Sequence, residues 1–566
     1  MYKRNALALG LLLASPLVAD DTVQDWYRYP RPAGTPPTVR PPDSEFLKIL
    51  PLPRPAPQLS AEQEQLGVAI WWADGTQLMD CLQPPSAEDL KQRPIVRTVA
   101  GEDEPLVMGL WGVREGGQVT LSVKQSPFAV TLRHVEFAPR YVPGAYYEHE
   151  IQGGRRIGFA NYLPKQATGQ IEAGRNTVFW ITVETPGDAR PGSYELDLSL
   201  IVHGKQVLDL AVAVEVADYV LPRADIAYGM YFRQHILPPR YRTQEMLRAY
   251  WRDMARHGMT STALYAYDRV HDESGQLLPL ANVPALNRLN DMVEAGLVTS
   301  EVPVMLLNGS LVDPFRADHP DIIARFKTEA KNHDWPPFLW YGPDEPAVND
   351  ESLAELQGLQ PTRKHFPIVT AISDKAAEAY ASLLDVWVLH AGTLTPKIRQ
   401  LAAESGAELW NYTCTNRGAG NAPFNRFYAG VYTWAFNLKG NFIWCYTENY
   451  AWEGDRGAIF CWVLPSDVGP VPSIAWEARR EGVEDYRTLR LLESRIAAQP
   501  ASPAAAEAKA WLQSLRDRVD WYLARDIPPS LYPWDAPELC TLCPNFQPGE
   551  LSQVRRQAAD YLAKIK

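Results

Sequence analysis

Two adjacent carboxylates are the residues of this chain best suited to chemistry. Asp344 and Glu345 lie in the stretch Trp-Tyr-Gly-Pro-Asp-Glu-Pro, directly after a short apolar run. Neighbouring carboxylates repel each other, so the pair costs stability unless its charge is used. Cleavage of a glycosidic bond needs such groups, because one acid protonates the leaving oxygen while a second group stabilises the oxocarbenium ion. The alternative is a solvated loop that caps a helix, because Asp and Glu are common there.

Aromatic, amide, imidazole and acidic side chains follow other apolar runs of the same region. Flat aromatic faces stack on the C–H face of a sugar ring, although many such residues in a protein of this size belong to its core. The 18 Trp and 26 Tyr of the chain therefore favour a carbohydrate ligand without proving one. We predict that the following residues contact a glycan: Tyr341, Trp387, His390, Asn411, Tyr412, Trp444, Tyr446, His235 and Asp268.

These residues are positioned by a repeated strand and helix rhythm that begins near residue 224. Amphipathic segments at 244–257 and 319–333 are two of the predicted helices. Eight strand–helix units predict a TIM (β/α)8 barrel, whose active site lies at the carboxyl ends of the strands. The acid pair then follows the fourth strand. The predicted strands are 226–232, 262–267, 303–308, 338–341, 367–372, 385–390, 408–413 and 441–446.

The residue types around the pair discriminate between mechanisms. Many retaining barrel enzymes carry Asn-Glu-Pro here and a nucleophilic Glu at the end of the seventh strand. In this chain Asp344 replaces the Asn, and the seventh strand ends Asn-Tyr-Thr-Cys-Thr, with Glu408 at its other end. A 2-acetamido sugar supplies its own nucleophile, so Asp344 would accept the acetamido N–H and Glu345 would be the general acid and base.

Two other functions remain open at this point. One is a retaining glycosidase for another polysaccharide, with Glu448 or Asp268 as a separate nucleophile. The other is a non-catalytic polysaccharide-binding protein that keeps the barrel. We expect no cofactor and no metal site, and the sequence does not define an oligomeric state.

The rest of the chain divides by composition. Residues 1–19 resemble a signal peptide, with a short positive and then an apolar segment, which predicts a periplasmic or secreted protein. Residues 20–65 are a Pro-rich, extended lead-in. Short alternating runs over 66–222 predict a β-sandwich, with a hairpin turn at 186–192. We place the barrel at 223–480 and a mainly helical tail at 481–566. The predicted sandwich strands include 118–123, 177–185, 194–202 and 208–216.

Charge and cysteine content exclude several classes of partner. The net charge of −12 gives no overall positive field for nucleic acid. No later apolar run reaches the roughly 18 residues of a membrane span, so we expect no integral membrane segment. Cys540 and Cys543 form a Cys-x-x-Cys pair in a Pro-rich segment of the tail, where a local disulfide is favoured over a redox or zinc site.

Three stretches resemble glycoside hydrolase family 123, the β-N-acetylgalactosaminidase-type enzymes, and the related DUF4091 group. They are the acid-pair segment 340–346, the Arg-Glu-Gly-Val-Glu-Asp-Tyr motif at 480–486 with the residues around it, and the segment from the 185–194 turn to 219–222. The resemblance spans roughly residues 66–500. It implies an N-terminal β-sandwich, a catalytic barrel and substrate-assisted retention, with Asp344 as stabiliser and Glu345 as acid, and N-acetylgalactosamine as the favoured sugar. Glu484, Asp485 and Tyr486 of the motif are expected to brace the barrel.

Overall fold

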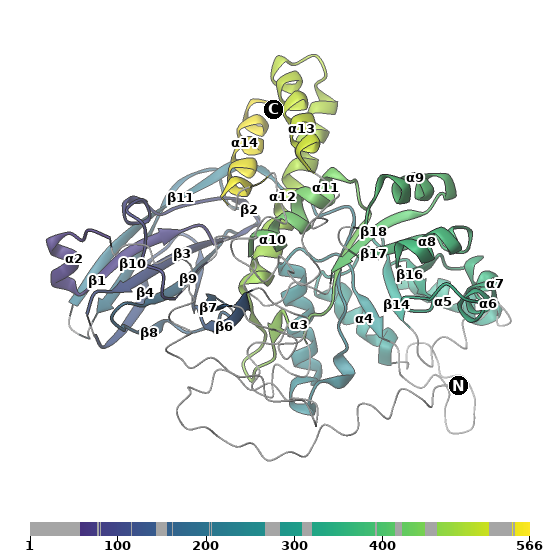
Figure 1. Cartoon of the computed structure of the whole chain (residues 1–566), viewed down its shortest axis with the longest axis horizontal. Helices are drawn as coiled ribbons and strands as arrows, with labels where there is room; N and C mark the ends of the chain where they lie inside the picture. The colour runs from purple at the N-terminus through teal and green to yellow at the C-terminus, as the bar shows by residue number, and fades with distance from the viewer. Residues whose placement is uncertain are drawn as a thin grey trace.

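The structure is a computed structural model. It describes residues 57–565 except 76–78, 80, 115, 143–154, 161, 203, 205, 266–283, 308–319, 391–392, 414–421, 448–460, 520–545 and 547–548. The predicted signal peptide and the Cys540–Cys543 pair therefore lie outside the described residues. Figure 1 shows three parts across the molecule: N-terminal sheets at the left, a central group of long helices, and a barrel at the right.

The N-terminal part consists mainly of two sheets. A four-stranded sheet has the order β1 (Val68–Ala73), β3 (Asp103–Gly112), β9 (Asn176–Glu184), β5 (Ala129–His134). A five-stranded sheet has the order β2 (Ile95–Ala100), β11 (Gln206–Val220), β10 (Gly192–Val202), β4 (Gln118–Gln125), β8 (Thr168–Gln170). Side chains from both sheets share one hydrophobic cluster. The second half of β10 alternates buried and half-buried residues accordingly, whereas β9 is buried along almost its whole length. A separate hairpin pairs β6 (Phe137–Val142) with β7 (Arg155–Ala160).

Two predictions for this region were wrong in detail. The turn at 186–192 is not a hairpin, because β9 and β10 belong to different sheets and the turn carries the chain from one to the other. The extended lead-in ends at Ser60 rather than at residue 65, because α2 (Ala61–Leu66) begins at the next residue. Ser60 caps that helix in a capping box with Gln63, and no proline occurs between Pro57 and the end of the helix. The four sandwich strands named from the sequence are strands in the structure.

The eight predicted barrel strands are all present and all parallel. Their order in the sheet follows the sequence around the barrel, and a parallel bridge between Tyr231 and Ala263 joins the first strand region to the second, so the barrel is nearly closed. The strands are β12 (Ala227–Met230), β13 (Ala263–Tyr265), β14 (Val304–Leu307), β15 (Phe338–Tyr341), β16 (Ile368–Ile372), β17 (Val386–His390), β18 (Glu408–Thr413) and β19 (Gly440–Ile443).

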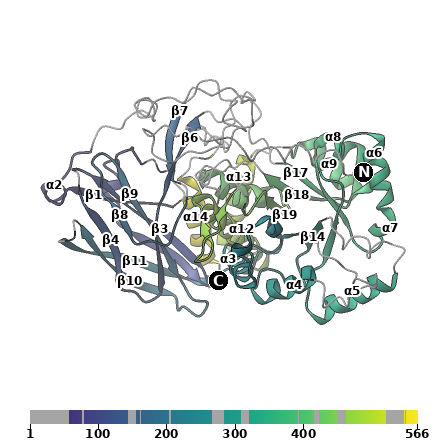
Figure 2. The ribbon, with the colours of Figure 1, turned by 90° about the horizontal axis from the view of Figure 1, so that it is seen from below.

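Helices follow these strands and cover the outside of the barrel (Figure 2). Thr243, Asn349, Ser373 and Thr395 accept a hydrogen bond from the first turn of α3, α6, α8 and α9, respectively. The helices are α3 (Gln244–Arg256), α4 (Pro284–Glu294), α5 (Pro320–Asn332), α6 (Asp350–Gly358), α7 (Gln360–Arg363), α8 (Asp374–Tyr380), α9 (Pro396–Ser405), α10 (Ala422–Phe427) and α11 (Thr433–Ala435), with a π-helical turn at Tyr428–Tyr432.

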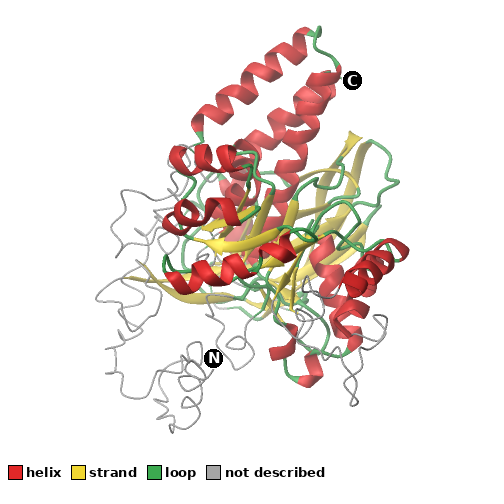
Figure 3. Cartoon of the chain, turned by 90° about the vertical axis from the view of Figure 1, so that its right-hand side faces the viewer, coloured by secondary structure: helices red, strands yellow, loops and turns green. Residues whose placement is uncertain are grey.

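The C-terminal part is helical, as predicted. The short strands β20 (Val463–Leu464) and β21 (Val471–Pro472) precede α12 (Ile474–Ala498), and α13 (Pro503–Arg518) and α14 (Glu550–Lys564) follow it. The long helices extend beyond the sheets in Figure 3. Because α12 runs unbroken from 474 to 498, the boundary that we drew after residue 480 falls inside a helix. Within the described part of the chain, no helix is both long and apolar enough for a membrane span.

Buried ionic groups join the three parts along α12, at a place we call the seam. It consists of Glu102, Glu104, Arg426, Arg480, Glu481, Glu484, Asp485 and Arg555. Glu104 lies on β3 and Glu102 directly before it; the arginine at 426 comes from α10, and the arginine at 555 from α14. The Arg-Glu-Gly-x-Glu-Asp-Tyr motif therefore lies at a junction between parts rather than at the barrel mouth.

Candidate active site

The acid pair lies in the loop that follows β15, at the carboxyl end of the barrel. This loop is bonded to β16: the N–H of Gly342 donates to the carbonyl of Val369 at 2.8 Å, and the N–H of Glu345 to the carbonyl of Ala371 at 3.1 Å. The Thr370 hydroxyl donates to the carbonyl of Pro343. These bonds hold Glu345 at φ 47°, a conformation that side chains other than Gly adopt rarely and that clusters at functional sites.

Asp344 is held by the last residue of β15. The hydroxyl of Tyr341, which is 3% exposed, donates to Oδ1 of Asp344 at 2.7 Å. Partial burial raises the pKa of the Asp344 carboxyl above its ordinary value; the Tyr341 hydrogen bond opposes the rise, and the charge of Glu345 adds to it. Two adjacent acids are thus in different environments, which is how enzymes assign different roles to paired carboxyl groups.

Glu345 is held from another strand. The hydroxyl of Tyr412, near the end of β18, donates to Oε1 of Glu345 at 2.5 Å. The ring of His390, at the end of β17, meets the Tyr412 ring edge-on at 5.5 Å. Residues 390 and 412 are direct neighbours in the register of the two strands, so the barrel itself sets this contact. The predicted glycan contacts Tyr341, His390 and Tyr412 therefore lie beside the acid pair.

Aromatic residues at the carboxyl ends of the first and last strands complete the edge of the barrel that carries the acid pair, which we call the rim. Tyr231, directly after β12, lies 6.5 Å from the Tyr341 ring and 5.5 Å from the Trp444 ring, between ring centroids. The guanidinium of Arg233 lies over the Trp444 ring at 4.9 Å, a cation–π contact. Trp444 is half-buried and so keeps part of its ring available to a ligand. The exposed His235 lies 6.0 Å from the ring of Tyr265.

Three predicted glycan contacts are not accessible in the structure. Trp387 is 0% exposed and belongs to the core between the barrel and its helices. Asn411 is also fully buried, and its Oδ1 accepts a hydrogen bond from Tyr428. Tyr446 is fully buried and donates to Oδ2 of Asp253 on α3 at 2.7 Å. A side chain without exposed surface cannot contact a sugar, so these three predictions were wrong.

Strand alternation explains both these errors and what the sequence analysis missed. Successive side chains of a strand point to opposite faces. On β17, Val386 and Val388 line the barrel interior, so Trp387 between them points outward. Tyr231 and Tyr265 belong to the cluster inside the barrel, but they were not selected as glycan contacts from the sequence. The same alternation could have identified them.

The predicted contact Asp268 lies outside the described residues, and so does Glu448, a candidate for a separate nucleophile. Glu408 is described and begins β18, at the opposite end of the barrel from the acid pair. Between residues 408 and 413, Tyr412 is the side chain that approaches Glu345.

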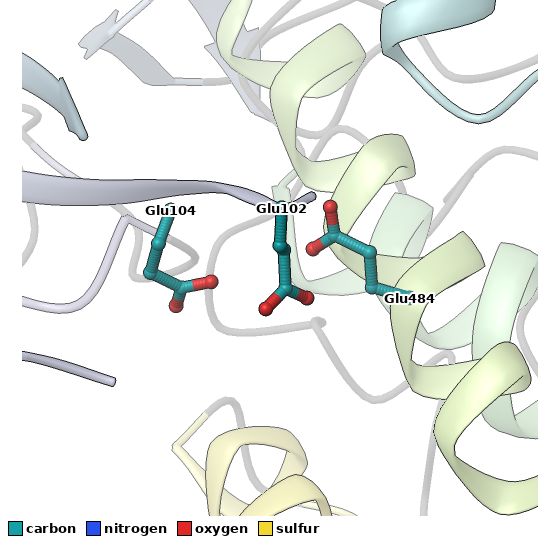
Figure 4. A group of neighbouring side chains, drawn as sticks. All are labelled: Glu102, Glu104 and Glu484. Carbon is teal, nitrogen blue, oxygen red and sulfur yellow. The ribbon is translucent and has the colours of Figure 1, made fainter. Parts of the chain in front are cut away.

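One group of acids in the described residues is close enough to hold a cation, but it lies in the seam. Figure 4 shows Glu102, Glu104 and Glu484 converging from the N-terminal sheets and α12. Nη1 of Arg555 approaches their carboxylate oxygens at 3.8, 3.4 and 3.3 Å, respectively. The protein therefore supplies its own cation to this group.

The fold and the rim can now be compared with known proteins. Residues 310–492 match the family model described as "Glycoside hydrolase 123, catalytic domain". Among solved structures, a family 123 glycoside hydrolase from Clostridium perfringens is similar, with a TM-score of 0.60 and 11% identity over 88% of this chain and 99% of that chain. That protein is described in connection with glycolipid glycan hydrolysis. A GH5 xyloglucanase from Bacteroides ovatus also matches, at 8% identity over 70% of this chain and 99% of that chain, with a TM-score of 0.28. No curated protein matches the sequence.

The nearly closed parallel barrel and the family match define this protein as a glycoside hydrolase. The non-catalytic alternative is thereby set aside. More particularly, residues 310–492 match the catalytic domain of family 123, the family that the acid-pair and 480–486 motifs resemble. The matched residues run from residue 310, after β14, into α12, so they include the acid pair and the α12 part of the seam.

Proposed function

We propose that this enzyme hydrolyses glycans with β-linked N-acetylhexosamine, N-acetylgalactosamine being favoured, by substrate-assisted catalysis with retention. The observation that carries the proposal is the arrangement of the acid pair: Asp344 is hydrogen-bonded by Tyr341, and Glu345 by Tyr412. In retaining enzymes with a protein nucleophile, a carboxylate lies about 5–5.5 Å from the acid. Here a tyrosine stands at the end of β18, where such a nucleophile would be expected.

The two acids would act in turn. Asp344, ionised, accepts the acetamido N–H of the substrate and balances the positive charge that develops as the acetamido oxygen bonds to C1. Glu345, protonated, gives its proton to the glycosidic oxygen as the bond from C1 to that oxygen breaks. The product is an oxazolinium intermediate and the released alcohol. Water then attacks C1 while Glu345 takes its proton, which restores the acetamido group and gives net retention.

A panel of aryl β-glycosides tests the sugar and the mechanism together. We expect turnover of the N-acetylgalactosamine substrate, weaker turnover of N-acetylglucosamine, and none of galactose or glucose. A thiazoline analogue of the intermediate should inhibit competitively. Turnover of the plain sugars without thiazoline inhibition would instead favour a separate nucleophile, Glu448 or Asp268.

Replacement of each acid tests its role. Asp344→Asn and Glu345→Gln should each remove most activity while the melting temperature changes little, because both residues are exposed in the loop. An Asp344→Asn enzyme with near-native rates on the acetamido substrate would refute the stabilising role of Asp344.

We also propose that the two N-terminal sheets form a β-sandwich domain and that the protein is exported. The support for export is the charged, apolar and small-residue order of residues 1–19. Sequencing of the mature N-terminus tests it, and a start at Asp20 is expected. A retained Met1 in the exporting host would contradict export by cleavage.

A further inference from the structure

The hydroxyl of Tyr341 occupies a node between the barrel and the acid pair. It donates to Oδ1 of Asp344 at 2.7 Å, and it accepts a hydrogen bond from the backbone N–H of Ala371 at 3.2 Å. One strand end therefore bonds the reactive loop and the neighbouring strand β16 through a single oxygen atom.

The direction of these bonds follows from the chemistry of the groups. A backbone N–H can only donate, so the Tyr341 oxygen is the acceptor toward Ala371. An ionised carboxylate can only accept, so the tyrosine proton points to Asp344. Burial first of all, and then the neighbouring Tyr231 and Asp344, raise the pKa of Tyr341 well above its ordinary value, so this proton stays in place over the working pH range.

The ring that carries the hydroxyl is itself fixed. Tyr341 belongs to the packed interior of the barrel, and Tyr231 lies edge-on to it at 6.5 Å. Tyr231 packs in turn on Phe442 at 5.7 Å and on Trp444 at 5.5 Å. The hydroxyl thus has a defined position set by β12, β15 and β19.

From this geometry we propose that Tyr341 is a positioning residue for the reaction: it orients the Asp344 carboxylate and keeps it ionised, which leaves Oδ2 for the acetamido N–H of the substrate. The inference rests on the proposed substrate-assisted mechanism and deepens it. A hydrogen bond to the charged form of a carboxyl lowers its pKa, and here it counteracts the effects of burial and of Glu345.

The variant Tyr341→Phe removes the hydroxyl and keeps the ring. We expect kcat on the acetamido substrate to fall by about 10- to 100-fold, because the stabilising carboxylate loses its orientation. The acid limb of the pH profile of kcat/KM should move upward by about half a unit or more, because the pKa of Asp344 rises when the hydrogen bond is lost. A purely structural role would lower the amount of folded enzyme without moving this limb.

Tyr380→Phe is a matched control. The hydroxyl of Tyr380 accepts from the N–H of Asn349 at 3.0 Å and donates to the carbonyl of Ala347 at 2.8 Å, in the same loop but away from the acids. The Tyr380 hydroxyl also lies 3.1 Å from the carbonyl of Asn349, a second acceptor. Both variants thus lose a hydroxyl that accepts from one backbone N–H and donates to an oxygen, but only Tyr341→Phe touches a carboxylate. We expect Tyr380→Phe to leave the acid limb in place.

A second substitution covers the case in which Tyr341→Phe does not fold. Incorporation of 3-fluorotyrosine at position 341 keeps the hydroxyl and makes it a better donor, so the acid limb should move downward. If both the Tyr341→Phe and the 3-fluorotyrosine enzymes keep the native acid limb, the positioning role is wrong. That result is distinguishable from failure of the proposed mechanism, in which Asp344→Asn itself retains activity.

Discussion

The Tyr412 hydroxyl donates a 2.5 Å hydrogen bond to Oε1 of Glu345. The two residues belong to β18 and to the loop after β15, and β16 and β17 lie between these strands in the barrel order. The bond therefore spans part of the barrel mouth and connects the proposed acid to a strand end that carries a nucleophile in many retaining barrel enzymes.

The variant Tyr412→Phe should reduce kcat/KM by about tenfold, because the proton donor is no longer oriented toward the leaving oxygen. If the effect acts through Glu345, it should disappear in the Glu345→Gln background, as a double-mutant cycle can show. Equal losses in both backgrounds would mean that Tyr412 acts independently of Glu345.

The variant Glu345→Gln should lose far more activity on substrates with poor leaving groups than on a 2,4-dinitrophenyl glycoside, whose departure needs no proton. Steady-state rates across a leaving-group series check this effect. Equal losses on all leaving groups would contradict the general-acid role.

Two tryptophans, one on β17 and one directly after β19, should respond in opposite ways. Trp444→Ala should raise KM severalfold with a small change in stability, because this half-buried ring lies on the rim. Trp387→Ala should reduce the free energy of unfolding by about 3–5 kcal/mol, because it leaves a cavity in the core. Chemical denaturation and Michaelis kinetics of both variants provide the comparison, and a KM effect confined to Trp387→Ala would reverse the assignment.

Stability should fall as the pH rises from about 5 to 8. Burial raises the pKa of Glu481 and that of Glu484 from the ordinary 4.5 to about 7. The folded state thus binds more protons than the unfolded state in this range, so their contribution is complete below pH 4.5 and is lost as the pH passes through 7. The carboxyls of Glu102, Glu104 and Asp485 and the guanidinium groups of Arg426, Arg480 and Arg555 surround the pair.

Unfolding midpoints measured from pH 5 to 8 should therefore decline in the wild type and decline less in Glu481→Gln or Glu484→Gln. The amide stays neutral at every pH in this range, so it removes one titration and keeps the shape of the side chain. A wild-type midpoint that rises between pH 5 and 8 would contradict this account of the seam.

The variant Arg555→Met should lower the free energy of unfolding by about 3–5 kcal/mol, because the neighbouring acids lose a buried counter-charge. Arg556→Met is the control on the same helix, since Arg556 is exposed, and it should change the unfolding midpoint little. Differential scanning calorimetry of the two variants makes the comparison. Similar midpoints for both would show that Arg555 has no special role in the seam.

The barrel could be read from the sequence because its strands are short apolar runs with regular spacing. Seven of the eight begin and end within two residues of the predicted bounds, and the eighth, β19, ends three residues earlier than predicted; the position of Asp344 and Glu345 at a strand end follows directly from these strands. Such local patterns depend only on residues close together in the sequence. The hydrogen bond from Tyr412 to Glu345 could not be predicted in this way, because it depends on how far each strand is staggered in the closed sheet.

The errors have the same origin. Trp387, Asn411 and Tyr446 have side chains that suit a sugar, but residue type does not say which face of a strand a residue occupies. The turn at 186–192 has hairpin composition, yet the partner of each flanking strand is chosen by long-range packing of two sheets. The 480–486 motif could be recognised as structural from its predicted place on a helix. Its ionic contacts with three distant segments could not be predicted from the sequence.

That seam has a consequence for how this enzyme can be divided. A barrel excised at residues 223 and 480 would lose Glu102, Glu104 and Arg555, and would cut α12 between Arg480 and Glu481, which contact each other at 3.1 Å. Arg426 would be left in the fragment without Asp485. The catalytic part is therefore not an interchangeable cassette. Any chimera or minimal enzyme built from it has to carry the N-terminal sheets and the last helix along.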